Sequence, residues 1–131
     1  MLSMSEAQLQ RGLIEAAELH GWRVYHVTNV RTTLLIYNTT AKGYPDLTMV
    51  HERRGLIVYA ELKNATRDKK AAAHQQAWAT AIAMAARFTP ERVLHCLWRP
   101  QHYDDALAFI AGETDTPPNR TTVNLHQMEW S

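Results

Sequence analysis

Two acidic residues and one lysine in this sequence have the types and spacing that metal-dependent hydrolysis requires. Asp46 follows the chain breaker Gly43-Tyr44-Pro45, and Glu61 lies two residues before Lys63 in a later apolar segment. Carboxylate oxygens suit Mg²⁺ or Mn²⁺, which keep several bound waters. Such an ion polarises a phosphodiester and lowers the pKa of a bound water, and a nearby ammonium stabilises negative charge on phosphorus. These three residues are the candidate catalytic set.

The segments around the candidate set predict a β-hairpin. Leu47–His51 is typical of a strand, Glu52–Gly55 of a turn, and Leu56–Lys63 of a nearly continuous apolar strand. In an antiparallel hairpin the start of the first strand lies beside the end of the second, so Asp46 and Glu61 should meet. A carboxylate in an apolar strand is costly unless it is paired or binds a metal ion.

A structural ion pair is the alternative interpretation of Glu61 and Lys63. Residues two apart in a strand point to the same face, and Glu-x-Lys triplets are common in proteins. The Gly-Tyr-Pro-Asp sequence that ends at Asp46, at hairpin distance upstream, favours a shared site over a chance salt bridge.

Elements outside the hairpin complete an α/β pattern. A helix is expected after the N-cap Ser5 and should end near Gly21, while residues 28–42 are ambiguous. The other expected elements are strands over Trp22–Val27 and Val93–Trp98 and helices over Ala71–Arg87 and Tyr103–Ala111. The order is α-β-β-β-α-β-α, and the fourth strand should lie parallel to its neighbour because a crossover helix precedes it. This order predicts a small mixed sheet flanked by helices.

The length of the chain suits one domain. A sequence of 131 residues, of which 46% are hydrophobic, can bury one core. We expect this domain to span residues 1–112. Residues 113–131 contain Pro117-Pro118 and little other pattern, so a flexible C-terminal tail is predicted there.

Composition argues against several classes of protein. No apolar run is long enough to cross a bilayer, and the first residues lack a signal segment, so a cytoplasmic protein without membrane contact is expected.

The single cysteine, Cys96, excludes an intramolecular disulfide and a cysteine-based zinc cluster. The histidines form no H-x-x-H array, which disfavours a His-metal nuclease. Residues 1–100 carry an excess of Lys and Arg that could attract a polyanion.

The Pro45-Asp46 pair followed by Glu61-Leu62-Lys63 resembles the PD-(D/E)XK nuclease motif. The wider pattern is similar to the VRR-NUC branch of that superfamily, small phage and bacterial nucleases related to Holliday-junction resolvases. The blocks that carry the resemblance are Ser5-Glu6 with Gln10, Gly21–His26, Gly43–Asp46, Ala60–Lys63, Gln75–Trp78 and Leu97–Pro100. The resemblance covers residues 4–112 and implies a restriction-endonuclease-like core.

The resemblance implies a Mg²⁺- or Mn²⁺-dependent DNA endonuclease with no organic cofactor. Asp46 and Glu61 would be metal ligands together with the backbone carbonyl of Leu62, and Lys63 would be the catalytic lysine. A non-catalytic DNA-binding module on the same fold is the alternative, and the intact acidic and basic set favours the enzyme.

The same resemblance adds Glu6 and Gln75, both in predicted helices, to the candidate site. Glu6 matches an acid that reaches the metal directly or through water, although an acid in the first turn also stabilises a helix dipole without any other role. Gln75 matches a glutamine that supports the site from the second helix, and the adjacent Gln76 competes for that role.

DNA is the expected partner. The candidate phosphate contacts flank the catalytic set in the sequence and are Arg31, Lys42, Arg67, Lys69 and Lys70. Arg31 and Lys42, in the loop before Asp46, are favoured, whereas each of the others could equally be a solvated loop charge. Arg53 and Arg54, at the hairpin turn, are also candidate phosphate contacts that could equally be solvated charges. Because no recognition helix or zinc module appears, cleavage directed by DNA structure is expected rather than sequence-specific cleavage, as a junction, flap or nicking activity.

A homodimer and a host compartment also follow from the resemblance. Relatives often act as homodimers, and the apolar segment Leu34–Tyr37 is a candidate interface that could equally belong to the core. The expected location is the cytoplasm of a bacterial or phage-infected cell.

Overall fold

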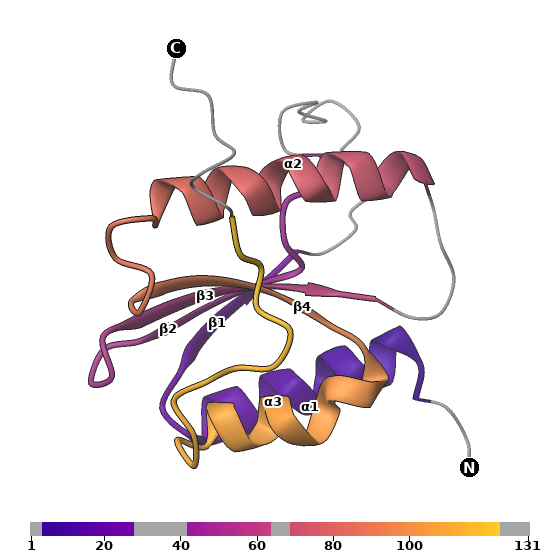
Figure 1. The fold of residues 1–131 in the computed structure, drawn as a ribbon. Coiled ribbons are helices and arrows are strands. Elements are labelled where there is room, and N and C mark those ends of the chain that lie inside the picture. The colour runs from indigo at the N-terminus through magenta and orange to yellow at the C-terminus, as the bar shows by residue number, and fades with distance from the viewer. Residues whose placement is uncertain (1–3, 28–41, 64–68, 124–131) are drawn as a thin grey trace.

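The computed structural model describes residues 4–27, 42–63 and 69–123, with the side chains of 69–71 left out. The elements in these residues are α1 (Glu6–Leu19), β1 (Arg23–His26), β2 (Leu47–His51), β3 (Leu56–Leu62), α2 (Lys69–Ala85), β4 (Val93–Trp98), a 3₁₀ turn η3 (Pro100–His102) and α3 (Tyr103–Ile110) (Figure 1). The α/β class and the order of the elements agree with the prediction from the sequence. The candidate interface Leu34–Tyr37 lies outside the described residues.

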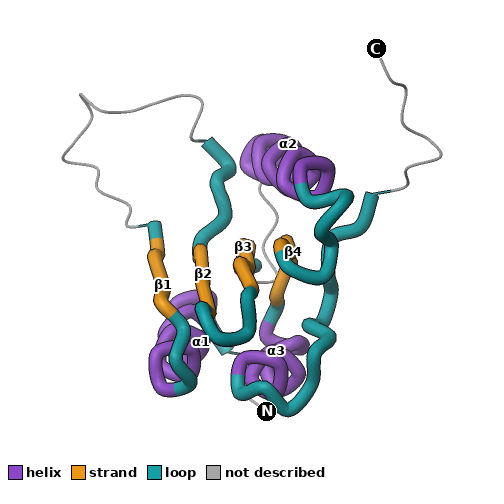
Figure 2. Tube along the Cα trace, turned by 90° about the vertical axis from the view of Figure 1, so that its left-hand side faces the viewer, coloured by secondary structure: helices purple, strands orange, loops and turns teal. Residues whose placement is uncertain are grey.

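The four strands form one mixed, open sheet in the order β1-β2-β3-β4. β1 pairs antiparallel with β2, β2 pairs antiparallel with β3, and β3 pairs parallel with β4. Figures 1 and 2 show α2 on one face of the sheet and α1 with α3 on the other. α2 connects β3 to β4, which is the crossover that a parallel pair requires.

The apolar core lies between the sheet and the α1/α3 layer. Leu9, Leu13 and Ala17 are spaced four residues apart and are fully buried, so they form the stripe of α1 that faces the sheet. Val58 and Leu62 alternate along β3 on the same side. Tyr59 and Glu61 alternate with these residues and therefore face α2, where Gln75 bonds to Glu61.

The first turn of α1 is fixed by a capping box. The Ser5 side chain accepts a hydrogen bond from the backbone N–H of Gln8 at 3.1 Å, and the Gln8 side chain accepts one from the backbone N–H of Ser5 at 2.9 Å. Such a cap contributes about 1 kcal/mol to helix stability. Gly21 follows the helix with a φ of 87°, which confirms its predicted role at the end of α1. The cap places Glu6 at the first helical position.

Residues 113–123 run along the free edge of β4. The backbone N–H of Thr121 donates to the carbonyl of His95 at 2.7 Å, and the indole N–H of Trp98 donates to the carbonyl of Pro118 at 2.9 Å. Residues 118–121 of the expected tail therefore contact β4, and we call residues 113–123 the β4 strap. Residues 124–131 lie outside the described part of the chain. Among the described helices, none has the length and apolar character needed to cross a bilayer.

Candidate active site

Asp46 stands directly before β2, and its carboxylate is held by the neighbouring strand. Its Oδ2 accepts a hydrogen bond from the backbone N–H of Leu62 at 2.8 Å. The next residue, Leu47, pairs with Ala60, so the register brings Asp46 opposite Glu61. The hairpin therefore brings the two acids together, as the spacing in the sequence predicts.

Glu61 is a buried carboxylic acid, with only 3% of its surface exposed. Its Oε1 accepts a hydrogen bond from Nε2 of Gln75 at 2.9 Å, while its Oε2 is buried and receives no N–H donor from the described residues. Burial, followed by the neighbouring carboxyl group of Asp46, raises the pKa of Glu61 to about 10. Both acids can be ionised together only when nearby positive charge compensates them.

Lys63 supplies one positive charge to this end of the sheet. It follows β3 directly, is half-buried, and lies two residues from Glu61. Its charge lowers the pKa of Glu61 and so opposes the effect of burial and of Asp46. This influence places the ammonium within electrostatic reach of the acidic pair.

Glu6 lies near the same group of charges from the opposite layer. Partial burial, and then the charge of Asp46, raise the pKa of Glu6, whereas the charge of Lys63 lowers it. The structure thus brings Glu6, an exposed residue at the start of α1, close to the acidic pair. No hydrogen bond joins Glu6 to either acid among the described contacts.

Gln75, and not Gln76, faces the acidic pair. Gln75 is half-buried and bonds to Glu61, whereas Gln76 is exposed. The Oε1 of Gln75 is also buried and has no hydrogen-bond partner among the described residues. The Gln75 amide N–H therefore orients Glu61, while the Oε1 of Gln75 remains available to accept a hydrogen bond.

The position of Gln75 depends on close contact between α2 and the loop before Asp46. Gly43 has a φ of 80°, and a Cβ built on it would lie 2.3 Å from the backbone carbonyl carbon of His74. Only glycine allows this approach without a shift of α2. The sequence interpretation treated Gly43 only as a chain breaker and missed this role, although the Gly-Tyr-Pro-Asp spacing was the available signal.

Tyr44 joins the same loop to α2 and to the sheet. Its ring lies edge-on to Trp78 of α2 at 5.0 Å and to Tyr59 of β3 at 6.4 Å between centroids. Its hydroxyl is 3.0 Å from the Thr48 hydroxyl. These contacts wedge the loop between β2, β3 and α2, so Asp46 and Gln75 are positioned by one aromatic cluster.

The candidate phosphate contacts are only partly within the described structure. Lys42 is exposed and lies one residue before Gly43, on the loop that leads to Asp46. Lys69 and Lys70 form the start of α2, but their side chains lie outside the described part, as do Arg31 and Arg67 altogether.

Arg54 is engaged elsewhere. Its guanidinium lies 5.3 Å from the ring centroid of Trp22 and 5.0 Å from that of Phe109. Its Nη1 donates to the carbonyl of Phe109 at 2.8 Å, close to the end of α3. The interpretation of Arg54 as a phosphate contact is therefore wrong, since its side chain stabilises the packing of α3.

The donor set fits a small divalent ion of the Mg²⁺ type. Among the described residues, no group of three or more His, Cys, Asp and Glu side chains forms a complete metal cage. Mg²⁺ needs no such cage, because it is usually held by one or two carboxylates and completes its shell with water and substrate phosphate. Asp46 and Glu61 provide two such carboxylates, and the Oε2 of Glu61 accepts no hydrogen bond from the described residues. The ligand role of the Leu62 carbonyl stays a prediction.

No protein-family model, curated protein or solved structure matches this chain. Interpretation of the site therefore depends on its residues and their arrangement.

Proposed function

We propose that this protein is a Mg²⁺- or Mn²⁺-dependent DNA endonuclease with a restriction-endonuclease-like core of the VRR-NUC type. The observation that carries the proposal is the burial of Glu61 against Asp46, with Lys63 two residues away on the same strand face. A buried pair of acids is unfavourable for folding alone, and perturbed carboxylates of this kind concentrate at functional sites.

Each residue of the proposed site has a distinct task. A divalent ion held by Asp46 and Glu61 would supply Lewis acidity at the scissile phosphate and acidify a bound water. The Leu62 N–H and the Gln75 amide hold the two carboxylates in orientation. The ammonium of Lys63 stabilises the negative charge that develops on the phosphoryl oxygens.

Glu6 completes the proposed site from α1. As an exposed acid near Asp46, it can accept a hydrogen bond from a water at the mouth of the site. A water held there is oriented for attack on phosphorus, which is a positioning role.

The proposed substrate is DNA bound through its backbone. Lys42 lies on the loop that leads to Asp46, and Arg31, Arg67, Lys69 and Lys70 are the further proposed phosphate contacts. Phosphate contacts position a nucleic acid without reading its bases. Structure-directed cleavage, as a junction, flap or nicking activity, is consistent with such contacts. Action as a homodimer, in the cytoplasm of a bacterial or phage-infected cell, belongs to the same proposal.

Cleavage assays on defined DNA structures test the proposal. The purified chain is incubated with four-way, flapped, single-stranded and linear DNA in Mg²⁺, Mn²⁺ or EDTA. We expect cutting only with the metal ions, and loss of cutting but not of DNA binding in Asp46→Asn and Lys63→Ala. Asp104→Asn is the matched control, because Asp104 is an exposed acid in the first turn of α3.

Two results would contradict the assignment. One is cutting that persists in EDTA or in either site variant. The other is binding of DNA by the wild-type chain without cutting in any metal, which would indicate a non-catalytic DNA-binding module.

A further inference from the structure

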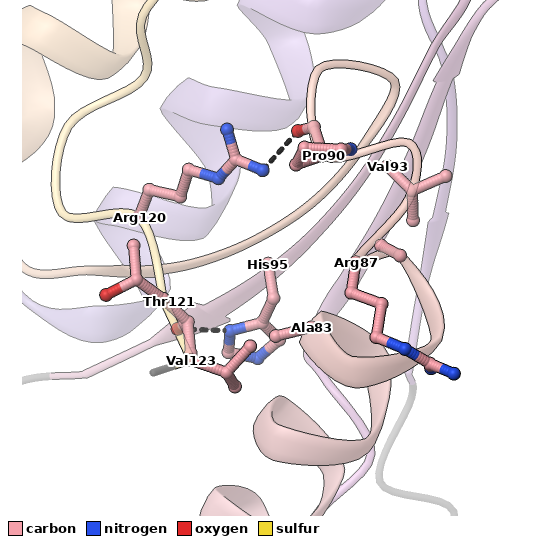
Figure 3. Close-up of a pocket in the computed structure, with 10 residues that line it drawn as sticks. Ala83, Arg87, Pro90, Val93, His95, Arg120, Thr121 and Val123 are labelled. Atoms are coloured by element: carbon pink, nitrogen blue, oxygen red, sulfur yellow. Dashed lines mark hydrogen bonds between the residues drawn. The ribbon is translucent and has the colours of Figure 1, made fainter. Parts of the chain in front are cut away.

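A cavity of about 310 Å³ lies at the other end of the sheet from Lys63. It is enclosed by the C-terminal part of α2, the start of β4 and the β4 strap (Figure 3). Val93 of the cavity wall pairs with Ile57, near the start of β3, whereas Glu61 pairs with Leu97 further along. The cavity is therefore separate from the proposed catalytic residues.

The wall of the cavity carries positive charge. Arg120 of the strap lines it, together with the hydroxyl residues Thr121 and Thr122, and none of the described lining residues is acidic. Arg87, in the turn that follows α2, also lines it, although its Nη1 donates to the carbonyl of Met84. Arg120 donates to the carbonyl of Pro90 and has no carboxylate partner among the described residues. A guanidinium has five N–H donors, so Arg120 retains donors for a second acceptor.

His95 adds an unpaired polar atom to the floor of the same cavity. The residue is 4% exposed, and its Nδ1 lies 2.7 Å from the Thr121 hydroxyl. Its Nε2 is buried and has no hydrogen-bond partner among the described residues. Burial lowers the pKa of His95 to about 4, so the ring is neutral near pH 7. When the Thr121 hydroxyl donates to Nδ1, Nε2 carries the proton and can donate to a ligand.

Apolar side chains form the remainder of the wall. Ala83 lines the cavity from α2, Ala86 from the turn after it, Val93 from β4 and Val123 from the end of the strap. Figure 3 shows Val123 beside the His95 ring, with Arg120 and Arg87 on opposite sides of it. Pockets of this composition, apolar with a few polar groups, are typical of small-molecule sites.

We propose that this cavity binds a small organic anion that carries a phosphate or carboxylate head on a compact apolar body. Arg120 pairs with the anionic head, because charge-assisted hydrogen bonds from guanidinium to such groups are strong and directional. Nε2 of His95 donates to the same ligand once the Val123 side chain moves aside. The alanine and valine side chains contact the apolar body. The site is independent of the proposed nuclease activity.

Titration of the full chain, labelled with ¹⁵N-histidine, tests the proposal. The probes are phenyl phosphate, benzoate and the uncharged benzyl alcohol. We expect a saturable shift of the His95 ring nitrogens with phenyl phosphate or benzoate and no such shift with benzyl alcohol. The stronger of the two anions identifies the head group. Absence of a saturable shift with either anion at millimolar concentration would overturn the proposal.

Charge-neutral variants locate the bound anion. Arg120→Gln should weaken binding about tenfold or more, since it removes a charge-assisted hydrogen bond. Arg87→Gln should weaken it less, because the Arg87 guanidinium is also held by the Met84 carbonyl and the Phe88 ring, and it serves as the second variant if the strap is disturbed by the first. Arg23→Gln is the matched control, because Arg23 is exposed on β1 and outside the cavity. Binding that is unchanged in both cavity variants would place the anion elsewhere and refute the inference.

Discussion

The face of the sheet beneath α1 and α3 presents Val58 and Leu62 to other apolar residues, whereas the face beneath α2 presents Glu61 and His95. Both faces are buried, and buried polar atoms without hydrogen-bond partners among the described residues occur on Glu61, Gln75 and His95 of the α2 face, at the Nε of Arg87, and on Arg54, which packs against Trp22 and Phe109. Buried polar atoms of this kind are rare in folded proteins. The two buried polar residues, Glu61 and His95, nonetheless both lie on the α2 face, whereas the core under α1 and α3 is apolar.

The largest expected effect comes from the α1/α3 face. Phe109→Ala should lower the free energy of unfolding by about 3–5 kcal/mol, because Phe109 is fully buried in the core and its removal leaves a cavity. Urea denaturation followed by circular dichroism measures the change. Leu19→Ala is the control: Leu19 is 80% exposed, and its variant should change stability by less than about 0.5 kcal/mol. A small effect at Phe109 would remove the contrast between the two faces.

The corresponding change on the α2 face should separate function from stability. Glu61→Gln replaces a buried acid with a neutral group of the same shape, so the free energy of unfolding without metal should change by less than about 1 kcal/mol. The same variant should lose Mn²⁺ binding, because a ligand oxygen with its charge is removed. Calorimetric titration with Mn²⁺ measures the second effect. Wild-type Mn²⁺ affinity in the variant would exclude Glu61 as a ligand.

The cavity end of the α2 face should make stability depend on pH. The pKa of His95 is about 4 in the folded chain against an ordinary 6.5, so between these values the unfolded chain takes up a proton that the folded chain does not. Stability should therefore fall by as much as about 3 kcal/mol as the pH decreases from 6.5 to 4, and then level off. Urea denaturation across this range checks the slope, which should be shallower in His95→Gln. Equal slopes in both proteins would show that other groups control it.

The last comparison concerns the contact between α2 and the loop before Asp46. Gly43 and Gly112 have similar φ values of 80° and 82°, but a Cβ has open space only at Gly112. Gly112→Ala should therefore cost about 1–2 kcal/mol from backbone strain alone. Gly43→Ala should cost more and should also weaken Mn²⁺ binding, because α2 and Gln75 move. Urea denaturation and Mn²⁺ titration of both variants measure the difference, and equal behaviour would argue against the positioning role of Gly43.

The hairpin and the meeting of its two acids could be predicted from the sequence. Strand residues alternate strictly, so the turn at Glu52–Gly55 fixes which residues face one another. The choice between Gln75 and Gln76 could not be made, because a helix register depends on where the helix begins. α2 begins at Lys69, two residues before the expected Ala71.

The β4 strap and the packing of Arg54 were beyond sequence reasoning for a different reason. The strap is held by backbone hydrogen bonds to β4. Such bonds require no periodic pattern of apolar residues, so the sequence carries no signal for them. Arg54 rests on Trp22 and Phe109, which are distant from it in the chain. Both features arise from tertiary contacts and not from local pattern.

The β4 strap also determines how copies of the chain can associate. An uncovered strand at the margin of a sheet can recruit a strand from another molecule and so lead to aggregation. The bridge between Cys96 and Arg120, with the hydrogen bond from Thr121 to His95, occupies that margin along β4. Growth of the sheet from one molecule into another is therefore blocked on this side, and a homodimer built by strand addition would have to form at β1.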